Sequence, residues 1–406
     1  MPTEKLDKAL DTEIEQLHAE GRAKIPERVI DGYIPPRGES GPRYRIQGID
    51  RPFIRLNSNS YLSLSNNPQM IEAADRATHD FGVGPGAVRF IDGTFIHHAD
   101  LEERTARFVN KPAAKIFNSA YTTNLGLAIA ISGKKTCWIG DTLNHNSIIR
   151  AMRIANIPRT NKGIYKHNDM DDLKRCLDEV DEGIERVIVV FDGIFSMRGD
   201  NAPIHEIQAV CGEYHDRFPE GVITVVDDSH GIGAYGDNGR GTAEYCGTNP
   251  DIIVGTFGKA FGVNGGFVAA SESVIEAVRQ KADTYIYTNP LSMADCAAAH
   301  TALDICDSNE GKTLLSNLKE RTQQFRNGLE SLGKESIPGP HPVVPMLVRD
   351  TGKTHETVRY LFEKGVLVVG LTFPVVPKGD ETIRFQINAA HTKKDIDDVL
   401  ELIERV

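Results

Sequence analysis

The sequence lacks any uninterrupted apolar run of about 18 residues, the length that a membrane-spanning helix requires. Its first residues, MPTEKLDKALDTEIEQL, are charged and contain no apolar core of the kind that a secretory signal has. We therefore expect a cytoplasmic protein with no membrane span.

Cysteine is scarce, with 6 in 406 residues, and no two cysteines form a CxxC pair. This scatter argues against a disulfide framework and against a zinc site, and it favours free thiols in a reducing compartment. No metal-binding residue is predicted. The cysteines are Cys137, Cys176, Cys211, Cys246, Cys296 and Cys306.

Positive charge is also in deficit, since the formal net charge is −11. Proteins that bind the phosphate backbone of nucleic acids carry basic surfaces, so a nucleic-acid partner is not expected. The chain is otherwise ordinary for a globular protein, with 40% hydrophobic and 25% charged residues. It is long enough for one large and one small domain.

Short apolar runs alternate with helical segments from about residue 60 onward. Continuous Val/Ile runs of this kind predict a mostly parallel sheet covered on both faces, an α/β fold. The runs are AAKIFNSA (113–120), KKTCWIGD (134–141), ERVIVVFDG (185–193), VITVVDD (222–228) and DIIVGTFGK (251–259). We predict an N-terminal helix and arm over 1–60, a large domain over 61–305 and a small α+β domain over 306–406.

The predicted N-terminal helix carries an apolar stripe of Leu6, Leu10, Ile14 and Leu17, spaced by four, four and three residues. This spacing predicts a helix with one apolar face. We expect that face to be covered by ordinary packing, in an arm that docks on something else and does not form an independent domain.

Most of the predicted strands end in polar or glycine residues, and VITVVDDSHG (222–231) is the clearest case. In parallel sheets of this type, ligands bind beyond the carboxyl ends of the strands. The polar side chains are therefore expected to converge on one edge of the sheet.

Lys259 lies just beyond a predicted buried strand, in GTFGKAFG (255–262). Burial disfavours the ammonium form, and a neutral lysine forms a Schiff base with an aldehyde. Considered alone, Lys259 is more simply explained as an exposed lysine after a strand.

Asp227 supports a cofactor-binding role for Lys259. A carboxylate at the edge of a buried sheet needs a cationic partner, and the protonated ring nitrogen of pyridoxal phosphate is one. His230, three residues on, is within reach of the phenolic oxygen of the ring or of the reacting centre. The neighbouring Asp228 is expected only to cap the next turn or helix.

Three further segments supply what a flat, phosphorylated cofactor needs. His145, in LNHNSII (143–149), follows a strand and begins a helix, so its ring is placed to stack on the cofactor. NSAYTTNLG (118–126) is a turn of small residues that opens a helix, whose N-terminal N–H groups suit a phosphate. Thr256 offers a hydroxyl to the same phosphate. Each feature alone is usually structural.

Taken in order, these segments resemble the fold-type I pyridoxal-phosphate enzymes, and within them the α-oxoamine synthase family. The matching stretches span nearly the whole chain and include NSNSYLSLSNNP (57–68), FDGIFSMRGDNAPI (191–204), DDSHGIGAYGDNGRG (227–241) and TIRFQINAAHT (382–392). The last stretch and its surroundings are most similar to the glycine C-acetyltransferase branch. The 8-amino-7-oxononanoate synthase, 5-aminolevulinate synthase and serine palmitoyltransferase branches are the alternatives.

The resemblance implies pyridoxal 5'-phosphate as cofactor and a role for each matching residue. Lys259 would hold the cofactor as a Schiff base and move the α-proton of the substrate, Asp227 would pair with the ring nitrogen, and His230 would contact the phenolic oxygen. The other implied cofactor contacts are His145, Ser196, Thr256, Thr288 and the backbone of Ala120 and Tyr121. Asn59 and Arg384 would bind the substrate carboxylate.

The implied reaction condenses a small amino acid, with glycine favoured, and an acyl-CoA to a 2-amino-3-oxo acid or its decarboxylated aminoketone. Thr288 would serve the cofactor of a neighbouring subunit, so the resemblance implies a homodimer with shared active sites. An aminotransferase remains a rival, and so does a non-catalytic partner subunit, although the latter would be expected to lack Lys259. A nucleotide-binding module is disfavoured because neither GxxxxGK[ST] nor GxGxxG after the first strand occurs.

Overall fold

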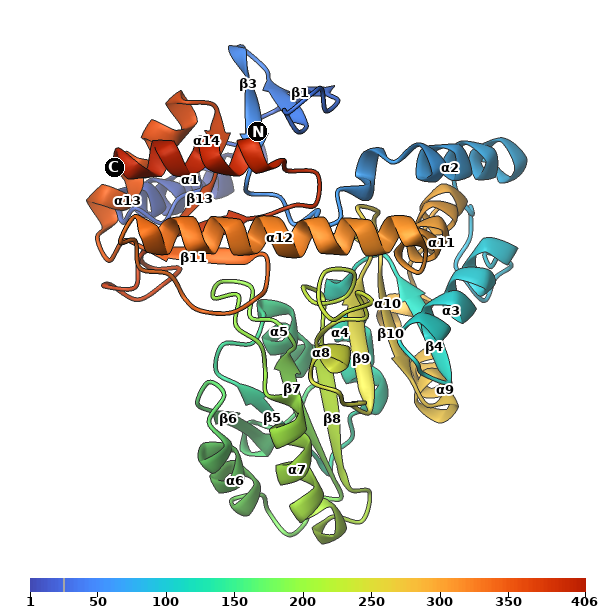
Figure 1. The fold of residues 1–406 in the computed structure, drawn as a ribbon. Helices are drawn as coiled ribbons and strands as arrows, with labels where there is room; N and C mark the ends of the chain where they lie inside the picture. The colour runs from blue at the N-terminus through green and yellow to red at the C-terminus, as the bar shows by residue number, and fades with distance from the viewer. Residues whose placement is uncertain (25) are drawn as a thin grey trace.

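The computed structural model describes residues 1–24 and 26–406 (Figure 1). Its largest sheet has seven strands in the order β4-β10-β9-β8-β7-β5-β6. Strands β5 to β9 pair in parallel, whereas β10 runs antiparallel to both β4 and β9. The strands are β4 (Ala113–Phe117), β5 (Thr136–Asp141), β6 (Lys162–Tyr165), β7 (Arg186–Asp192), β8 (Val222–Asp227), β9 (Ile252–Thr256) and β10 (Gly266–Ala270). The predicted mostly parallel sheet is confirmed.

Helices cover both faces of this sheet, as the continuous apolar strands predict. Along β7, Val187 and Val189 pack on one side, and Ile188 and Val190 pack on the other. One face is covered by α4 (Ala120–Ile131), α5 (Asn146–Ile154), α9 (Glu272–Lys281) and α10 (Asp283–Ile286). The other is covered by α3 (Ile96–Phe108), α6 (Met170–Asp178), α7 (Ile204–Tyr214) and α11 (Met293–Cys306). On this second side, α2 (Pro68–Phe81) packs against α11, and the short α8 (Thr242–Tyr245) contributes Ala243 to the same core.

The C-terminal part of the chain forms the α+β unit that its pattern predicts. A three-stranded antiparallel sheet in the order β11-β14-β13 packs with three helices. The long helix α12 lies across the large sheet's domain and leads into this unit (Figure 1). The elements are α12 (Asn309–Ser331), β11 (Val343–Leu347), α13 (Thr351–Glu363), β13 (Val369–Leu371), β14 (Thr382–Gln386) and α14 (Lys393–Glu404).

The N-terminal arm joins this C-terminal unit through backbone pairing that the sequence pattern did not reveal. Strands β1 (Ile30–Ile34), β2 (Arg43–Ile46) and β3 (Ile49–Arg55) form an antiparallel sheet, and β3 pairs in parallel with β12 (Val366–Leu367). Beyond β3, the Gln386 N–H donates to the Leu56 carbonyl and the Ala389 N–H donates to the Tyr61 carbonyl. The segment around residue 60 is thereby attached to the C-terminal unit.

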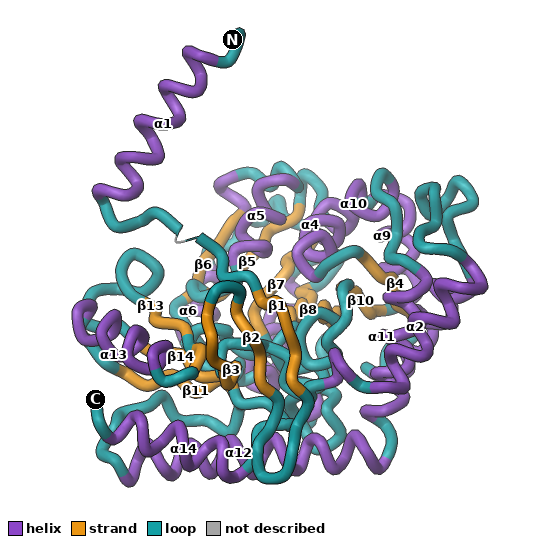
Figure 2. The backbone as a smooth tube through the Cα atoms, turned by 90° about the horizontal axis from the view of Figure 1, so that it is seen from above, coloured by secondary structure: helices purple, strands orange, loops and turns teal. Residues whose placement is uncertain are grey.

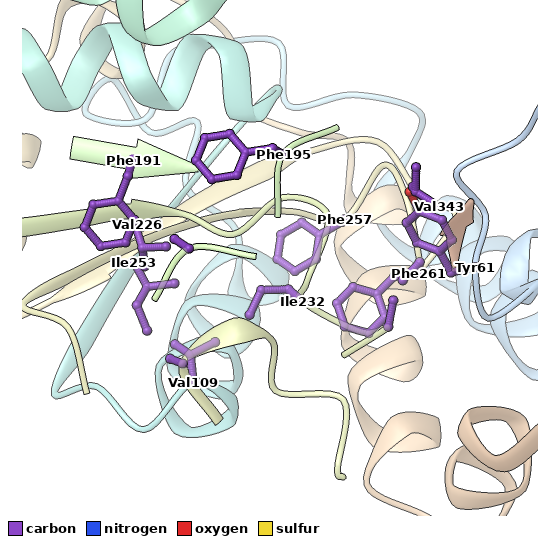
Figure 3. Close-up of a cluster of buried hydrophobic side chains, with 14 of the residues drawn as sticks. Tyr61, Val109, Phe191, Phe195, Val226, Ile232, Ile253, Phe257, Phe261 and Val343 are labelled. Atoms are coloured by element: carbon purple, nitrogen blue, oxygen red, sulfur yellow. The ribbon is translucent and has the colours of Figure 1, made fainter. Parts of the chain in front are cut away.

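One continuous apolar core links these parts. It begins at Phe191 on β7 and Val226 on β8 and continues to Phe257 beyond β9 (Figure 3). From there it reaches Tyr61 of the N-terminal segment and Val343 of the C-terminal unit. The core therefore holds the segment around Tyr61 and the C-terminal unit against the carboxyl edge of the large sheet.

The first helix, α1 (Glu4–Ala19), forms as predicted, but the described residues of its own chain do not cover its apolar stripe. None of its residues is buried, and α1 projects away from the body of the chain (Figure 2). The four stripe residues are all exposed, Leu6 by 57%. Periodicity identifies which face of a helix is apolar, but it does not show whether the same chain supplies a surface to cover that face.

Across the described residues, no helix combines the length and the apolar character needed to cross a bilayer. The six cysteines are free, and all but Cys246 are buried.

Candidate active site

The carboxyl ends of β7, β8 and β9 border a cavity of about 230 Å³. Asp192 and Asp227 end neighbouring strands in register, so the sheet itself places their side chains together. Eight of the predicted site residues line this cavity: Ala120, Tyr121, His145, Ser196, Asp227, His230, Thr256 and Lys259.

Lys259 follows β9 and its side chain is half-buried in the cavity wall. Burial lowers its pKa to about 8, although the carboxylates of Asp227 and Asp192 act in the opposite direction. A lysine with this pKa is still mostly protonated at pH 7, but its neutral fraction is far larger than that of an ordinary lysine. The neutral amine is the form that attacks an aldehyde.

Asp227 is buried, with 5% of its surface exposed, and hydrogen bonds hold both of its oxygens. Oδ1 accepts from the N–H of Ser229 at 3.1 Å and from its hydroxyl at 2.5 Å, and Oδ2 accepts from the Asn124 amide at 2.7 Å. Among the described residues, however, it forms no salt bridge. The carboxylate is thus oriented toward the cavity by uncharged partners.

Asn124 also connects Asp227 to His145. Its amide donates to the Ser147 hydroxyl at 2.9 Å, and that hydroxyl lies 2.7 Å from Nδ1 of His145. The Ser147 N–H also donates to Nδ1 at 3.3 Å, so His145 caps α5 with its own ring. Burial lowers the pKa of His145, which keeps the imidazole neutral. Neither Asn124 nor Ser147 was identified from the sequence, because both fall within ordinary helical patterns.

Asp192 is a second carboxylate in the cavity that the sequence prediction did not assign to the site. Burial, and then the negative charge of Asp227, raise the pKa of Asp192 well above its usual value. Oδ1 accepts a 3.4 Å hydrogen bond from the His145 N–H. Its position at the end of a strand that neighbours β8 was the signal that could have identified it.

The N-terminus of α4 forms the opposite wall. Ser119 caps the helix in a capping box with Thr122. The next two N–H groups, of Ala120 and Tyr121, have no acceptor among the described residues. Gly266 permits the close approach of this turn, because a Cβ there would lie 2.2 Å from the Ala120 nitrogen. The Thr256 hydroxyl donates to the Gly265 carbonyl at 2.8 Å, so its proton is already engaged.

His230 is held from behind the cavity by two aromatic residues. The Tyr61 hydroxyl lies 2.8 Å from Nδ1 of His230, and Nε2 of His341 contacts the His230 carbonyl at 3.0 Å. Burial lowers the pKa of His230 well below its usual value. Neither Tyr61 nor His341 was assigned a role from the sequence.

The two predicted carboxylate-binding residues lie beside the cavity instead of in its wall. Arg384, on β14, donates to the Ser196 carbonyl at 2.8 Å, and its buried Nε has no hydrogen-bond partner among the described residues. Burial lowers the pKa of Arg384. Asn59 lines an adjoining cavity and accepts from the Gln386 amide.

Thr288 is the one predicted residue that this chain leaves far from the cavity chemistry. It is exposed, and its hydroxyl donates to the Thr284 carbonyl at 2.7 Å. Asp228, expected only to cap a turn, accepts from the Thr242 N–H and hydroxyl at 2.6 Å at the start of α8. Burial raises the pKa of Asp228 to about 7.

An ionic cluster ties together the loops that carry His145 and Ser196. His167 lies between Asp141 and Asp200, 3.2 Å from each, and Arg198 also binds Asp200. Burial lowers the pKa of His167, but the hydrogen bonds and charges of the two carboxylates outweigh it and raise the pKa to about 9. The imidazolium therefore crosslinks the end of β5 to the loop that follows β7.

These features fit pyridoxal phosphate on the evidence of the chain alone. The lysine amine matches its aldehyde, the buried and unpaired carboxylate matches its ring N–H⁺, and the free N–H groups at the α4 terminus match its phosphate. Over residues 1–24 and 26–406, no group of three or more potential ligands is arranged to hold a metal ion.

Comparisons with known proteins agree with this reading. The model of the family "Aminotransferase class I and II" matches residues 51–403. The chain is 38% identical to 8-amino-7-oxononanoate synthase of Thermoanaerobacter pseudethanolicus over 90% of each chain. It is 34% identical to the mitochondrial 2-amino-3-ketobutyrate coenzyme A ligase of Homo sapiens, over 98% of this chain and 91% of that protein.

Solved structures give the same result. Sphingomonas wittichii serine palmitoyltransferase matches with a TM-score of 0.87 and 26% identity, over 99% of this chain and 97% of that one. Fold and site together define a fold-type I, pyridoxal-phosphate-dependent enzyme. More narrowly, the chain belongs to the α-oxoamine synthase family, whose members are C-acyltransferases.

Replacing Asn124 with leucine tests the network around Asp227. We expect Asn124→Leu to lower the free energy of unfolding by about 1.5–3 kcal/mol, because a buried carboxylate loses a hydrogen bond. Urea unfolding of the cofactor-free protein measures this. Asn327→Leu, an exposed asparagine on α12, is the control and should change stability by less than about 0.5 kcal/mol. Equal effects of the two substitutions would contradict the role of Asn124.

The His167 cluster predicts a specific pH dependence. Because the folded pKa is raised above the unfolded value of about 6.5, the cluster stabilises the fold fully below pH 6.5 and loses this effect as pH rises through about 9. The stability difference between the unmodified chain and His167→Gln should shrink by up to about 3 kcal/mol over that window. Urea midpoints from pH 6 to 10 measure it, with the exposed His205→Gln as control. A difference that does not change with pH would refute the prediction.

Proposed function

We propose that this chain condenses a small amino acid, with glycine favoured, and an acyl-CoA, releasing coenzyme A. The product is a 2-amino-3-oxo acid or the aminoketone left after decarboxylation. The observation that carries the proposal is the grouping of Lys259, Asp227 and Arg384 around one cavity edge, with the amine pKa lowered to about 8 and a guanidinium nitrogen unpaired. An amine, an acid and an unsatisfied arginine suit an amino-acid substrate that reacts at its α-carbon.

Each residue has a role that follows from its environment. Pyridoxal phosphate, when bound, supplies an aldehyde and a ring that stabilises negative charge at the α-carbon. Asp227 keeps the ring nitrogen protonated, because a buried carboxylate favours a neighbouring cation. Arg384 grips the substrate carboxylate, with Asn59 beside it. Lys259, in its neutral form, removes the α-proton.

The second substrate requires stabilisation of a thioester oxygen. When the α-carbon attacks the thioester carbonyl, negative charge grows on that oxygen before the thiolate of coenzyme A leaves. His230, in the cavity wall, is placed to donate a hydrogen bond to it. His145 and the N-terminus of α4 would hold the cofactor ring and phosphate during this step.

Acetyl-CoA with glycine is favoured by the motif FPVVPKGDETIRFQINAAHT (373–392), which is most similar to the glycine C-acetyltransferase branch. The 34% identity to the human 2-amino-3-ketobutyrate coenzyme A ligase is in line with that choice. The second candidate is 8-amino-7-oxononanoate synthase activity, favoured by the 38% identity to the Thermoanaerobacter protein. Serine palmitoyltransferase-like condensation and aminotransfer are the remaining alternatives.

We further propose that the enzyme is a homodimer with shared active sites. Thr288 supports this proposal, because it and its neighbour Tyr287, 73% exposed, have no function within their own chain's cavity. A second copy that covers this loop would give Thr288 a cofactor phosphate to contact.

The reaction is tested by mixing the cofactor-loaded protein with glycine, alanine or serine and adding acyl-CoAs of increasing length. Release of free coenzyme A thiol should be fastest with glycine and acetyl-CoA. In Lys259→Ala, borohydride should no longer fix the cofactor to the protein, and thiol release should fall to background. Fixation that persists in Lys259→Ala would refute the assignment of Lys259. Conversion of the cofactor to its amine form without any need for a thioester would instead favour aminotransfer.

The shared site is tested by Thr288→Ala. Loss of one hydrogen bond to a phosphate should weaken cofactor affinity by about 10-fold or more. Cofactor titration followed by absorbance measures it. Thr313→Ala is a matched control, because that exposed hydroxyl likewise donates to a carbonyl four residues earlier in the chain. Unchanged affinity in Thr288→Ala would count against a site shared between subunits.

A further inference from the structure

Tyr61, His230 and His341 form a buried cluster of rings behind the cavity. The ring centroids of Tyr61 and His341 are 5.4 Å apart in an edge-on arrangement, and those of Tyr61 and His230 are 6.2 Å apart. Tyr61 and His341 are fully buried, and Figure 3 shows Tyr61 at the end of the apolar core. The three residues come from segments far apart in the sequence, so their contact exists only in the folded chain.

Hydrogen bonding determines which ring nitrogen of His341 carries the proton. The Val343 N–H donates to Nδ1 of His341 at 3.1 Å, so Nδ1 is an acceptor and the proton is on Nε2. That Nε2–H donates to the His230 carbonyl at 3.0 Å. Burial lowers the pKa of His341 to about 3, so the ring remains neutral. His341 thus holds the backbone of His230 in one position.

The Tyr61 hydroxyl determines which ring nitrogen of His230 accepts a hydrogen bond. Burial raises the pKa of Tyr61, so its oxygen keeps its proton and must donate it. Two acceptors are near: Nδ1 of His230 at 2.8 Å and Oδ1 of Asn59 at 3.3 Å. The Asn59 oxygen already accepts from the amide of Gln386. The contact to Nδ1 of His230 is the shorter of the two, and no other donor to that nitrogen occurs in the part of the chain that the structure describes.

We propose that Tyr61 is a positioning residue, which donates to Nδ1 of His230 and thereby holds that imidazole in the tautomer with its proton on Nε2. The proposal rests on the function proposed above, in which His230 serves the reacting centre. It also links His230 to the substrate-carboxylate residues, because Tyr61 and Gln386 both contact Asn59.

The tautomer matters because it decides what His230 offers to the cavity. With the proton on Nε2, the nitrogen that Tyr61 does not occupy is a hydrogen-bond donor, as an oxygen with growing negative charge requires. With the proton on Nδ1, the same nitrogen would be an acceptor and would repel that oxygen. Because the hydrogen bond at one ring nitrogen sets the state of the other, a hydroxyl outside the cavity controls the group inside it.

The tautomer is measured directly by NMR on the cofactor-loaded protein labelled with ¹⁵N-histidine. Long-range ¹H–¹⁵N correlations distinguish a protonated ring nitrogen from a bare one, and the signals missing from His230→Gln identify His230. We expect a bare Nδ1 and a protonated Nε2 in the unmodified chain, and loss of this single pattern in Tyr61→Phe. A protonated Nδ1 in the unmodified chain, or an unchanged His230 pattern in Tyr61→Phe, overturns the proposal. The spectrum of the unmodified chain decides the tautomer even if Tyr61→Phe does not fold.

Steady-state kinetics provide the second readout. Tyr61→Phe should lower kcat by about 10-fold or more, with a smaller change in KM for the amino acid, because the donor acts where charge develops. Tyr165→Phe is the matched control, since Tyr165 is equally buried and its hydroxyl has no partner among the described residues. Equal kcat loss in both variants overturns the proposal. Absence of turnover with every acyl-CoA would refute the proposed function but would leave the NMR result to decide the tautomer.

Discussion

The site depends on one constraint: the carboxylate of Asp227 is buried at the end of a central strand, and none of the described residues forms a salt bridge with it. An unpaired buried charge is costly, so the fold leaves room for a cation to complete it. In the proposed function, the protonated ring of pyridoxal phosphate would be that cation. The same burial lowers the pKa of Lys259 and raises that of Asp192. A single desolvated sheet edge therefore shifts the pKa of both the amine and a neighbouring acid, as is common at functional sites.

Around that carboxylate, the chain uses complete hydrogen-bond networks to fix the reactive groups before any ligand arrives. Asn124 satisfies Asp227 and, through Ser147, orients His145. Tyr61 and His341 hold the side chain and the backbone of His230 from the opposite side. Groups fixed in this way need no reorganisation when charge develops, which is the main source of electrostatic catalysis. These networks also make the fold sensitive to substitution, because removal of one member leaves a buried partner without its hydrogen bond and lowers stability.

The site is also the place where the segment around residue 60 meets the C-terminal unit. The segment that carries Asn59 is paired with the strand that carries Arg384, and Arg384 reaches back to the loop of Ser196 in the large sheet's domain. In the proposed function, a substrate carboxylate bound there would contact two separate parts of the sequence, and Arg384 would connect it to a third.

Much of this could be predicted from the sequence. Buried Val/Ile runs that end in polar residues require a covered parallel sheet, and such a sheet necessarily gathers Asp227 and Lys259 at one edge. The motifs around them identified the family and the cofactor. The sequence could not reveal Asn124 or Tyr61, because their roles come from partners 103 and 169 residues away. It also could not show that α1 is left uncovered. The sequence by itself determines the type of each local element and the chemistry available in each motif. The tertiary structure decides which side chains are buried, which nitrogens and oxygens carry protons, and which distant segments pair, because these depend on contacts between residues far apart in the chain.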